Sequence, residues 1–450
     1  MNKEYLIQEK PMKAILVFAI PMIIGNFFQQ FYTMVDSIIV GRFVSEKALA
    51  AIGASYALTN VFISIAIGGG IGASVIASLY FGERRYKEMK KSISTALLSF
   101  LALSLILSIF GLSRSKELMI LLNTPENILD MATLYLDIYF YGLPFLFMYN
   151  VLAAMFNALG RSRTPLYLLI FSSILNIVLD LYFVISLDLG IAGAAWATFI
   201  AQGISAILAF LFFIREVSSY PSKIKGFFSI REMKKSARMA FPSIIQQSTV
   251  SIGMLLVQSV VNSFGAEILA GFSAGGRVES LCIVPMAAMG NAMSTYTAQN
   301  LGAGKYQRVQ EGYNSGVKII AAFALVICIF LVFLHTPIIS LFLGEDSTVL
   351  AQKTGTDFLQ FIAWFFILIG LKMLTDGLLR GAGDTKIFTM ANLVNLSIRV
   401  SVSALLAPVF GVAMVWYAIP MGWLANFLIS YREYHKNRRK YIPADRKSVV

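Results

Sequence analysis

The chain has 450 residues, of which 57% are hydrophobic and only 14% are charged, and its mean hydropathy is +0.73. Because an average soluble domain has about 25% charged residues, this composition excludes a soluble protein of several domains. The 37 Lys and Arg residues outnumber the 24 Asp and Glu residues and give a formal net charge of +13, which is typical of nucleic-acid or membrane binding; the apolar excess favours a polytopic membrane protein.

Twelve apolar stretches are long enough to cross a bilayer, which requires a helix of about 20 residues. Those of the first half are 14–40, 48–81, 92–112, 132–158, 165–187 and 190–214. Those of the second half are 239–263, 267–300, 317–343, 356–379, 387–407 and 411–431. The sequence therefore predicts an all-α protein with twelve transmembrane helices.

The Lys and Arg residues predict the orientation of these helices. The two termini and the loops on their side of the membrane hold 29 Lys and Arg residues, whereas the opposite loops hold 5. Positive residues concentrate on the cytoplasmic side, so both termini are expected in the cytoplasm. This distribution accounts for most of the net charge, and no nucleic-acid partner is expected.

The two halves of the chain resemble each other. AIPMIIG around Pro21 corresponds to AFPSIIQ around Pro242, and FGERRYKE at 81–88 corresponds to LGAGKYQR at 301–308. These pairs lie 221 and 220 residues apart. Because each half holds six spans, the repeat is parallel and predicts two six-helix bundles related by a pseudo-two-fold axis along the membrane normal.

This repeat predicts the domain organisation. Residues 1–214 form an N-lobe with helices 1–6, and residues 239–450 form a C-lobe with helices 7–12 and a basic tail. Residues 215–238 form a cytoplasmic connector, either as an interfacial helix with apolar and basic residues or as a solvated linker.

Two acidic residues lie deep inside predicted spans, where a charge costs about 2.5–3.5 kcal/mol. They are Asp36 in the first span and Asp180 in the fifth, and Asn176 shares a helix face with Asp180. Thr198 and Gln202 are likewise four residues apart, in the sixth span. Such oxygens suit a hard cation such as Na⁺, while two close carboxylates can instead share a proton. A third interpretation is a polar cluster that only holds helices together.

The second half does not repeat this acidic pair. Arg399 stands near the place of Asp180, and Lys372 and Asp376 are i,i+4 neighbours that predict a neutralising ion pair. A cation site is therefore expected in the first half alone. The sequence assigns no partner to Asp137, Arg277 and Glu279, which are further charges inside predicted spans.

Uncharged polar residues and a proline are candidates for a substrate cavity. Pro21 inside the first span can bend the helix, and the amides hydrogen-bond either to a substrate or between helices. The candidates are Pro21, Gln29, Asn150, Asn157 and Gln202.

Enzyme motifs are not found. GGGIGAS at 68–74 lies inside a span, so its glycines predict close helix packing through Gly68 and Gly72 rather than dinucleotide binding. The two histidines, His335 and His435, form no HExxH or triad pattern, and no DDxxD pair is present. We expect no enzymatic activity and no cofactor, and transport driven by an ion gradient.

Together, VDSIIVG after the first-span proline, LNIVLD, NALGRSRTP and LRGAGDTK resemble the multidrug and toxic compound extrusion (MATE) transporters, over about residues 10–432. The resemblance implies a two-lobed antiporter that exports organic cations and drugs in exchange for Na⁺ or H⁺. The cation-site residues of prokaryotic members fall on Asp36, Asn176, Asp180 and Thr198, and a proline and glutamine of that lobe fall on Pro21 and Gln29. The seventh span has no carboxylate, which departs from members with a C-lobe ion site.

The expected function is secondary active multidrug efflux from a bacterial plasma membrane by a monomer. Its expected partners are a small-molecule drug or organic cation and the lipid bilayer. The alternative is a lipid-linked oligosaccharide flippase of the related superfamily, which would place several Arg or Lys residues in the cavity.

Overall fold

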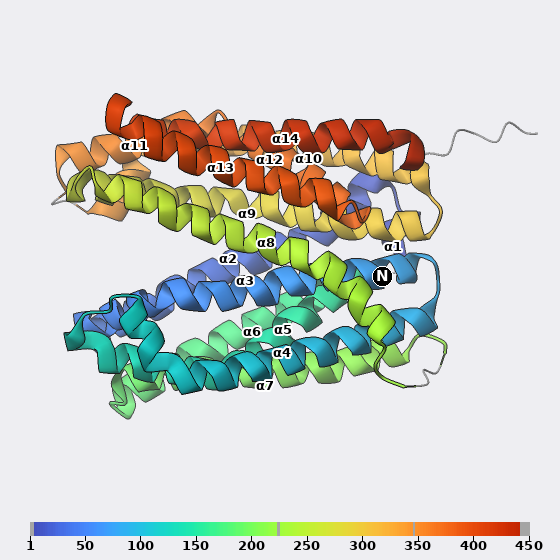
Figure 1. Ribbon diagram of the computed structural model, residues 1–450, viewed down its shortest axis with the longest axis horizontal. Helices are drawn as coiled ribbons and strands as arrows, with labels where there is room; N and C mark the ends of the chain where they lie inside the picture. The colour runs from blue at the N-terminus through green and yellow to red at the C-terminus, as the bar shows by residue number, and fades with distance from the viewer. Residues whose placement is uncertain (1–3, 223–225, 345–346, 442–450) are drawn as a thin grey trace, which may run out of the picture. The chain divides into compact units, whose positions relative to one another are not determined.

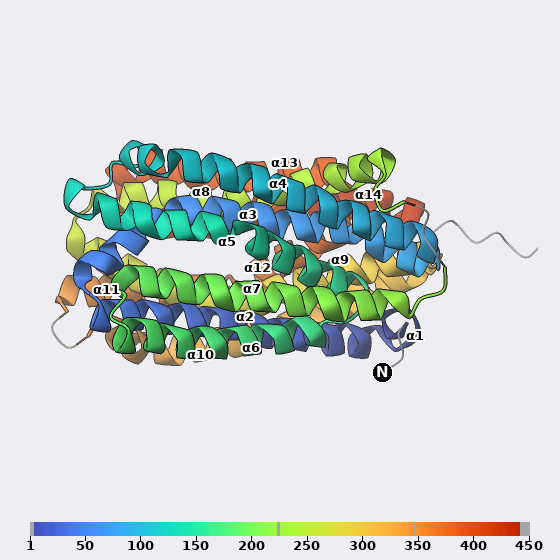
Figure 2. The ribbon, with the colours of Figure 1, turned by 90° about the horizontal axis from the view of Figure 1, so that it is seen from below.

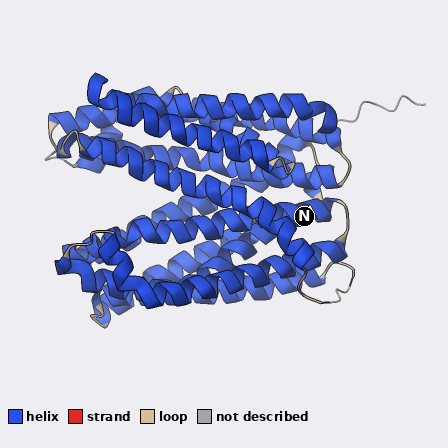
Figure 3. Cartoon of the chain, viewed as in Figure 1, coloured by secondary structure: helices blue, strands red, loops and turns tan. Residues whose placement is uncertain are grey.

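The computed structural model describes residues 4–222, 226–344 and 347–441. This part of the chain is helical throughout, and no strand occurs among the described residues (Figure 3). The first half comprises α1 (Tyr5–Gln8), α2 (Pro11–Phe43), α3 (Glu46–Gly82), α4 (Tyr86–Leu121), α5 (Glu126–Ala158), α6 (Arg163–Asp180), η1 (Leu181–Ser186) and α7 (Gly190–Ser218). The second half comprises α8 (Ile230–Asn262), α9 (Ala266–Gly302), α10 (Tyr306–Leu343), α11 (Val349–Ala363), α12 (Phe366–Gly381), α13 (Thr385–Phe410) and α14 (Ala413–Tyr441).

The helices confirm the predicted twelve-span layout. Among the described residues, ten helices are long and apolar enough to cross a membrane, and α11 with α12 forms an eleventh span bent by 57°. The twelfth is α9, which has 37 residues and carries Glu267, Arg277 and Glu279. Its charges and small residues lower its hydropathy, but most of its second half is buried against α10, α11 and α12.

The chain packs as two compact units. Residues 20–244 form one, here called the N-unit, and residues 1–19 with 245–450 form the other, here called the C-unit. Both boundaries fall inside helices, because α2 and α8 each begin in one unit and end in the other. The lobes predicted at 1–214 and 239–450 stay a prediction from the repeat.

In the N-unit, α5 is the central helix and packs against α3, α4 and α7, while α6 lies along α7 (Figures 1 and 2). Glycines let the start of α8 approach α3 closely. A Cβ on Gly72 would lie 2.4 Å from the Ala240 Cα, and one on Gly68 would lie 2.7 Å from the Ile244 Cα. The predicted packing role of both glycines is therefore confirmed.

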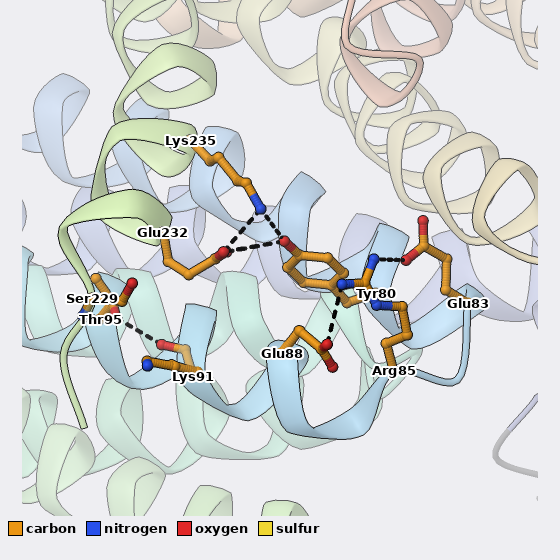
Figure 4. Close-up of polar contacts among 9 residues, drawn as sticks. All are labelled: Tyr80, Glu83, Arg85, Glu88, Lys91, Thr95, Ser229, Glu232 and Lys235. Carbon is orange, nitrogen blue, oxygen red and sulfur yellow. Dashed lines mark hydrogen bonds and ion pairs between the residues drawn. The ribbon is translucent and has the colours of Figure 1, made fainter. Parts of the chain in front are cut away.

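Polar contacts fasten the start of α8 to the N-unit (Figure 4). The Tyr80 hydroxyl of α3 donates to the Glu232 carboxylate at 3.2 Å, and the Lys235 ammonium binds both Glu232, at 2.9 Å, and the Tyr80 hydroxyl. The Ser229 backbone N–H donates to Thr95 Oγ1 of α4 at 3.1 Å. The start of α8 is thus fixed on α3 and α4.

The segment at 215–238 has no helix of its own in its described residues. It comprises the end of α7, a turn and the start of α8, and residues 223–225 lie outside the described part of the chain. The Lys90 ammonium of α4 donates to the Tyr220 and Ser222 carbonyls at 2.8 and 3.0 Å. These contacts hold the described part of the segment against α4, and the role of 215–238 as a connector stays a prediction from the repeat.

The N-terminal helix α1 is fastened to the C-unit in a similar way. Its Leu6 side chain is buried, and the Leu6 carbonyl accepts a hydrogen bond from Asn300 Nδ2 of α9 at 3.2 Å. Lys305 donates to the Ile7 carbonyl at 3.0 Å, and Arg308 donates to the Glu9 carbonyl at 2.7 Å. The start of α8 is therefore held by side chains of α3 and α4, and α1 is held by side chains of the corresponding helix pair, α9 and α10.

Candidate functional site

The four predicted cation-site residues lie on three helices of the N-unit. Asp36 is on α2, Asn176 and Asp180 are on the last turns of α6, and Thr198 is on α7. Asp180 is fully buried, at the point where α6 continues as the short π-helical segment η1. A π-helical turn often marks a functional site, and here it begins next to the acidic residue.

Asn176 connects Asp180 to Thr198. With its amide oriented by the hydrogen bonds that it makes, Asn176 Nδ2 donates to Asp180 Oδ2 at 2.9 Å. Its Oδ1 accepts from the Thr198 backbone N–H and from Thr198 Oγ1, each at 3.2 Å. The amide therefore fixes the carboxyl of α6 relative to α7.

Asp36 completes the group from α2. Its carboxyl lies close enough to the Asp180 carboxyl for the two charges to interact, and two carboxyls this near to each other favour a state in which one of them holds a proton. Asp36 Oδ1 and Asp180 Oδ1 are buried and have no partner among the described residues. The pair thus has unused oxygen lone pairs that can take a proton or ligate a cation.

Tyrosines that the sequence reasoning did not select surround the pair. Tyr32 of α2 and Tyr135 of α5 lie near enough to both carboxyls for the carboxylate charges to act on them. Tyr139 lies one turn after Tyr135, and its hydroxyl donates to the Thr59 carbonyl at 3.2 Å. Tyr32 could have been selected from the sequence, because it lies four residues before Asp36 and therefore on the same helix face.

A pocket in the N-unit adjoins this group. Its lining includes Tyr135 and Tyr139 of α5 and Thr198, Phe199 and Gln202 of α7. Thr198 belongs both to the pocket wall and to the Asn176 hydrogen bonds, so the pocket opens next to the carboxyl pair. Gln202, a predicted cavity residue, is part of this wall.

The other predicted cavity residues are not gathered at this pocket. Pro21 is buried and Gln29 is exposed, both on α2. Asn150 Nδ2 donates to the Leu146 carbonyl of its own helix at 2.8 Å, and Asn157 Oδ1 is buried without a partner among the described residues. The Asn150 amide donor is therefore used inside α5.

The C-unit carries the ion pair that the sequence predicts. Lys372 and Asp376 of α12 are both buried and lie 3.0 Å apart. Asn392 of α13 accepts from Lys372 at 3.0 Å and donates to Asp376 at 3.2 Å, and Ser430 of α14 donates to Asp376 at 2.9 Å. Asp376 is therefore neutralised by Lys372 and hydrogen-bonded by Asn392 and Ser430.

Comparisons with known proteins agree with this architecture. A family model described as MatE matches residues 21–182 and 242–405, one match in each half of the repeat. The probable multidrug resistance protein YpnP of Bacillus subtilis is 30% identical over 434 residues, covering 96% of this chain and 97% of that protein. An FAD transporter of Shewanella oneidensis is 27% identical and covers 75% of each chain.

A solved structure described as the outward-facing conformation of a multidrug resistance MATE family transporter has the same fold. Its TM-score is 0.90 at 23% identity, and the match covers 99% of both chains. Since the MatE model matches both halves and the Bacillus relative matches nearly the whole length, the chain belongs to the multidrug and toxic compound extrusion (MATE) family of membrane transporters.

Proposed function

We propose that this protein is a secondary active multidrug efflux antiporter that exports organic cations and drugs in exchange for Na⁺ or H⁺. The observation that carries the proposal is the Asp36–Asp180 carboxyl pair of the N-unit, in which Asp180 is fully buried and each residue has a buried oxygen with no partner among the described residues. The relatives named as multidrug resistance proteins support the same class of cargo.

The coupling follows from the charge of the pair. When the two carboxyls share one proton, the group has a net charge of −1, which a second proton, Na⁺ or a cationic substrate can neutralise. For Na⁺, the carboxylate oxygens together with the Asn176 and Thr198 oxygens provide the ligands that a hard cation prefers. Because the coupling ion and the substrate neutralise the same charge, binding of one opposes binding of the other.

Binding at this group can be transmitted to α2. Asp36 lies on the same helix as Pro21, which interrupts the α2 backbone hydrogen bonds. In the proposed cycle, uptake of Na⁺ or H⁺ by Asp36 and Asp180 bends α2 at Pro21, narrows the N-unit part of the cavity and favours the return to the inward-facing state.

The lipid-linked oligosaccharide flippase is less well supported. It would need several free cationic side chains for a pyrophosphate, but Lys372 is paired with Asp376 and Arg277 is an exposed residue of α9. Only Arg399 remains of the three candidates within the spans. We further propose that the protein acts as a monomer in a bacterial plasma membrane, with both termini cytoplasmic.

Ethidium export from proteoliposomes tests the proposal. A Na⁺ gradient and a pH gradient are imposed separately on the native protein, Asp36→Asn and Asp180→Asn, with Asp188→Asn as the matched control because Asp188 is an exposed loop residue. We expect export under one gradient, lost in both site variants and kept in the control. Export that survives Asp36→Asn and Asp180→Asn would place the coupling site elsewhere, and no export by the native protein would refute the drug-antiport proposal.

A further inference from the structure

Helix α13 of the C-unit carries an asparagine four residues before a charged residue, as α6 does at Asp180, but with the opposite charge. LNIVLD at 175–180 of α6 resembles VNLSIR at 394–399 of α13, since Asn176 stands four residues before Asp180 and Asn395 stands four residues before Arg399. Both pairs have the i,i+4 spacing that places two side chains on one helix face. One face of α13 therefore carries an amide and a guanidinium, whereas one face of α6 carries an amide and a carboxylate.

Arg399 lies near an acidic residue without binding it. Glu279 of α9 is 7% exposed, and it lies close enough to Arg399 for the two charges to interact. Nevertheless, no described residue forms a salt bridge or hydrogen bond with either side chain, and Arg399 Nε is buried without a partner. Lys372 and Asp376, in the same unit, form a direct contact of 3.0 Å.

The packing of α13 on α14 fixes the position of Arg399. A Cβ on Gly422 of α14 would lie 2.3 Å from Asn395 Oδ1 and 3.1 Å from Arg399 Cγ. Glycine at this position therefore lets the stem of Arg399 and the Asn395 amide pack directly against α14. Because α9 packs instead on α10, α11 and α12, Glu279 is held on a different group of helices.

Two separated charges inside a membrane protein are costly. An ionisable side chain in a span costs about 2.5–3.5 kcal/mol on insertion scales, and such residues commonly mark substrate pathways. Direct pairing would reduce that cost, but the helices keep the carboxylate and the guanidinium apart. A ligand with a cationic group and an anionic group would satisfy both, since the guanidinium fork binds carboxylate or phosphate and the carboxylate accepts from an ammonium.

We propose that Glu279 and Arg399 form a recognition site in the C-unit for zwitterionic substrates, with the anionic group of the substrate bound by Arg399 and its cationic group by Glu279. The inference rests on the proposed drug-export function and specifies one class of its cargo. It is independent of the coupling residues Asp36 and Asp180, because all of its groups belong to the C-unit.

A matched pair of dyes tests this site. Rhodamine 110 carries a free carboxylate and is zwitterionic at neutral pH, whereas rhodamine 123 is its methyl ester and is cationic. Binding of each dye to the purified full-length protein in nanodiscs is measured by fluorescence polarisation for the native protein, Arg399→Gln, Arg399→Lys and Arg277→Gln. Arg277 is the matched control, because it is an exposed cation two residues from Glu279 on α9.

We expect Arg399→Gln to weaken rhodamine 110 binding about tenfold or more, because truncating one partner of a desolvated charge pair has effects of this size. Rhodamine 123 binding should persist in the same sample, which also shows that the variant is folded. Arg399→Lys should restore part of the rhodamine 110 affinity, and Arg277→Gln should change neither dye.

Equal weakening of both dyes by Arg399→Gln would overturn the inference, because it would show that Arg399 only supports the fold. Native protein that binds rhodamine 123 but not rhodamine 110 would also overturn it, while leaving the drug-export function intact. Native protein that binds neither dye would contradict the drug-export function itself, and with it the basis of this site.

Discussion

The Lys372–Asp376 pair gives a quantitative prediction about the C-unit. Lys372→Met removes the ammonium and leaves the Asp376 carboxylate buried, where side-chain exposures of 4% and 2% leave almost no access to water. Breaking a buried ion pair on one side costs about 3–5 kcal/mol. Because Ser430 and Asn392 still donate to Asp376, we expect a loss of about 3 kcal/mol in the free energy of unfolding, at the lower end of that range.

The double variant Lys372→Met/Asp376→Asn separates this cost from side-chain packing. It removes both charges and should recover most of the lost stability, since replacing a buried ion pair with neutral groups is often near neutral. Denaturant unfolding in detergent micelles measures the single and double variants in one cycle. The double variant should also keep gradient-driven ethidium export, because the proposed coupling site lies in the N-unit.

Equal destabilisation by the single and the double variant would contradict this reasoning, because it would mean that packing rather than an unpaired charge sets the cost. A stable double variant that has lost export would contradict the assignment of coupling to Asp36 and Asp180. It would instead show that the ion pair of α12 takes part in transport.

Three further predictions concern the N-unit. Gly72→Ala should lower the unfolding free energy by about 1–3 kcal/mol, because its Cβ would meet the α8 backbone at 2.4 Å. The control Gly53→Ala has nothing within 4 Å of its Cβ and should be neutral or stabilising. Equal effects of the two variants in the same unfolding assay would refute this reasoning. Tyr80→Phe should remove about 1 kcal/mol of hydrogen bonding at the start of α8 and speed amide exchange there, and unchanged exchange would argue against that contact. Asn176→Ala should raise the half-saturating coupling-ion concentration for export about tenfold, and an unchanged value would show that the amide does not position Asp180.

The number of spans was predictable because each has an apolar stretch long enough to cross a bilayer. The structure placed a helix at every predicted span, and the bend between α11 and α12 fell inside one of them. That α2 and α8 each begin in one unit and end in the other was not predictable from composition. It depends on tertiary contacts such as those of Glu232 with Tyr80, which lie 152 residues apart in the sequence.

The charge and the spacing of residues in the sequence were enough to predict part of the candidate site. Asp36 and Asp180 stood out because carboxylates inside spans are rare, and the i,i+4 rule joined Asn176 to Asp180. Tyr135 was missed because a tyrosine in a span is common and carries no charge. The proximity of Glu279 to Arg399 could not be predicted either, since it depends on the packing of helices that are separated by more than a hundred residues.

The most direct test of the shared-site proposal is ion release during substrate binding. Purified protein in a weakly buffered solution receives tetraphenylphosphonium, and a pH indicator and a Na⁺-selective electrode record the released ion. We predict that the native protein releases about one H⁺ or Na⁺ for each tetraphenylphosphonium bound. The double variant Asp36→Asn/Asp180→Asn should release none. Stoichiometric release by that double variant, or substrate binding to the native protein without release of either ion, would contradict exchange at this carboxyl pair.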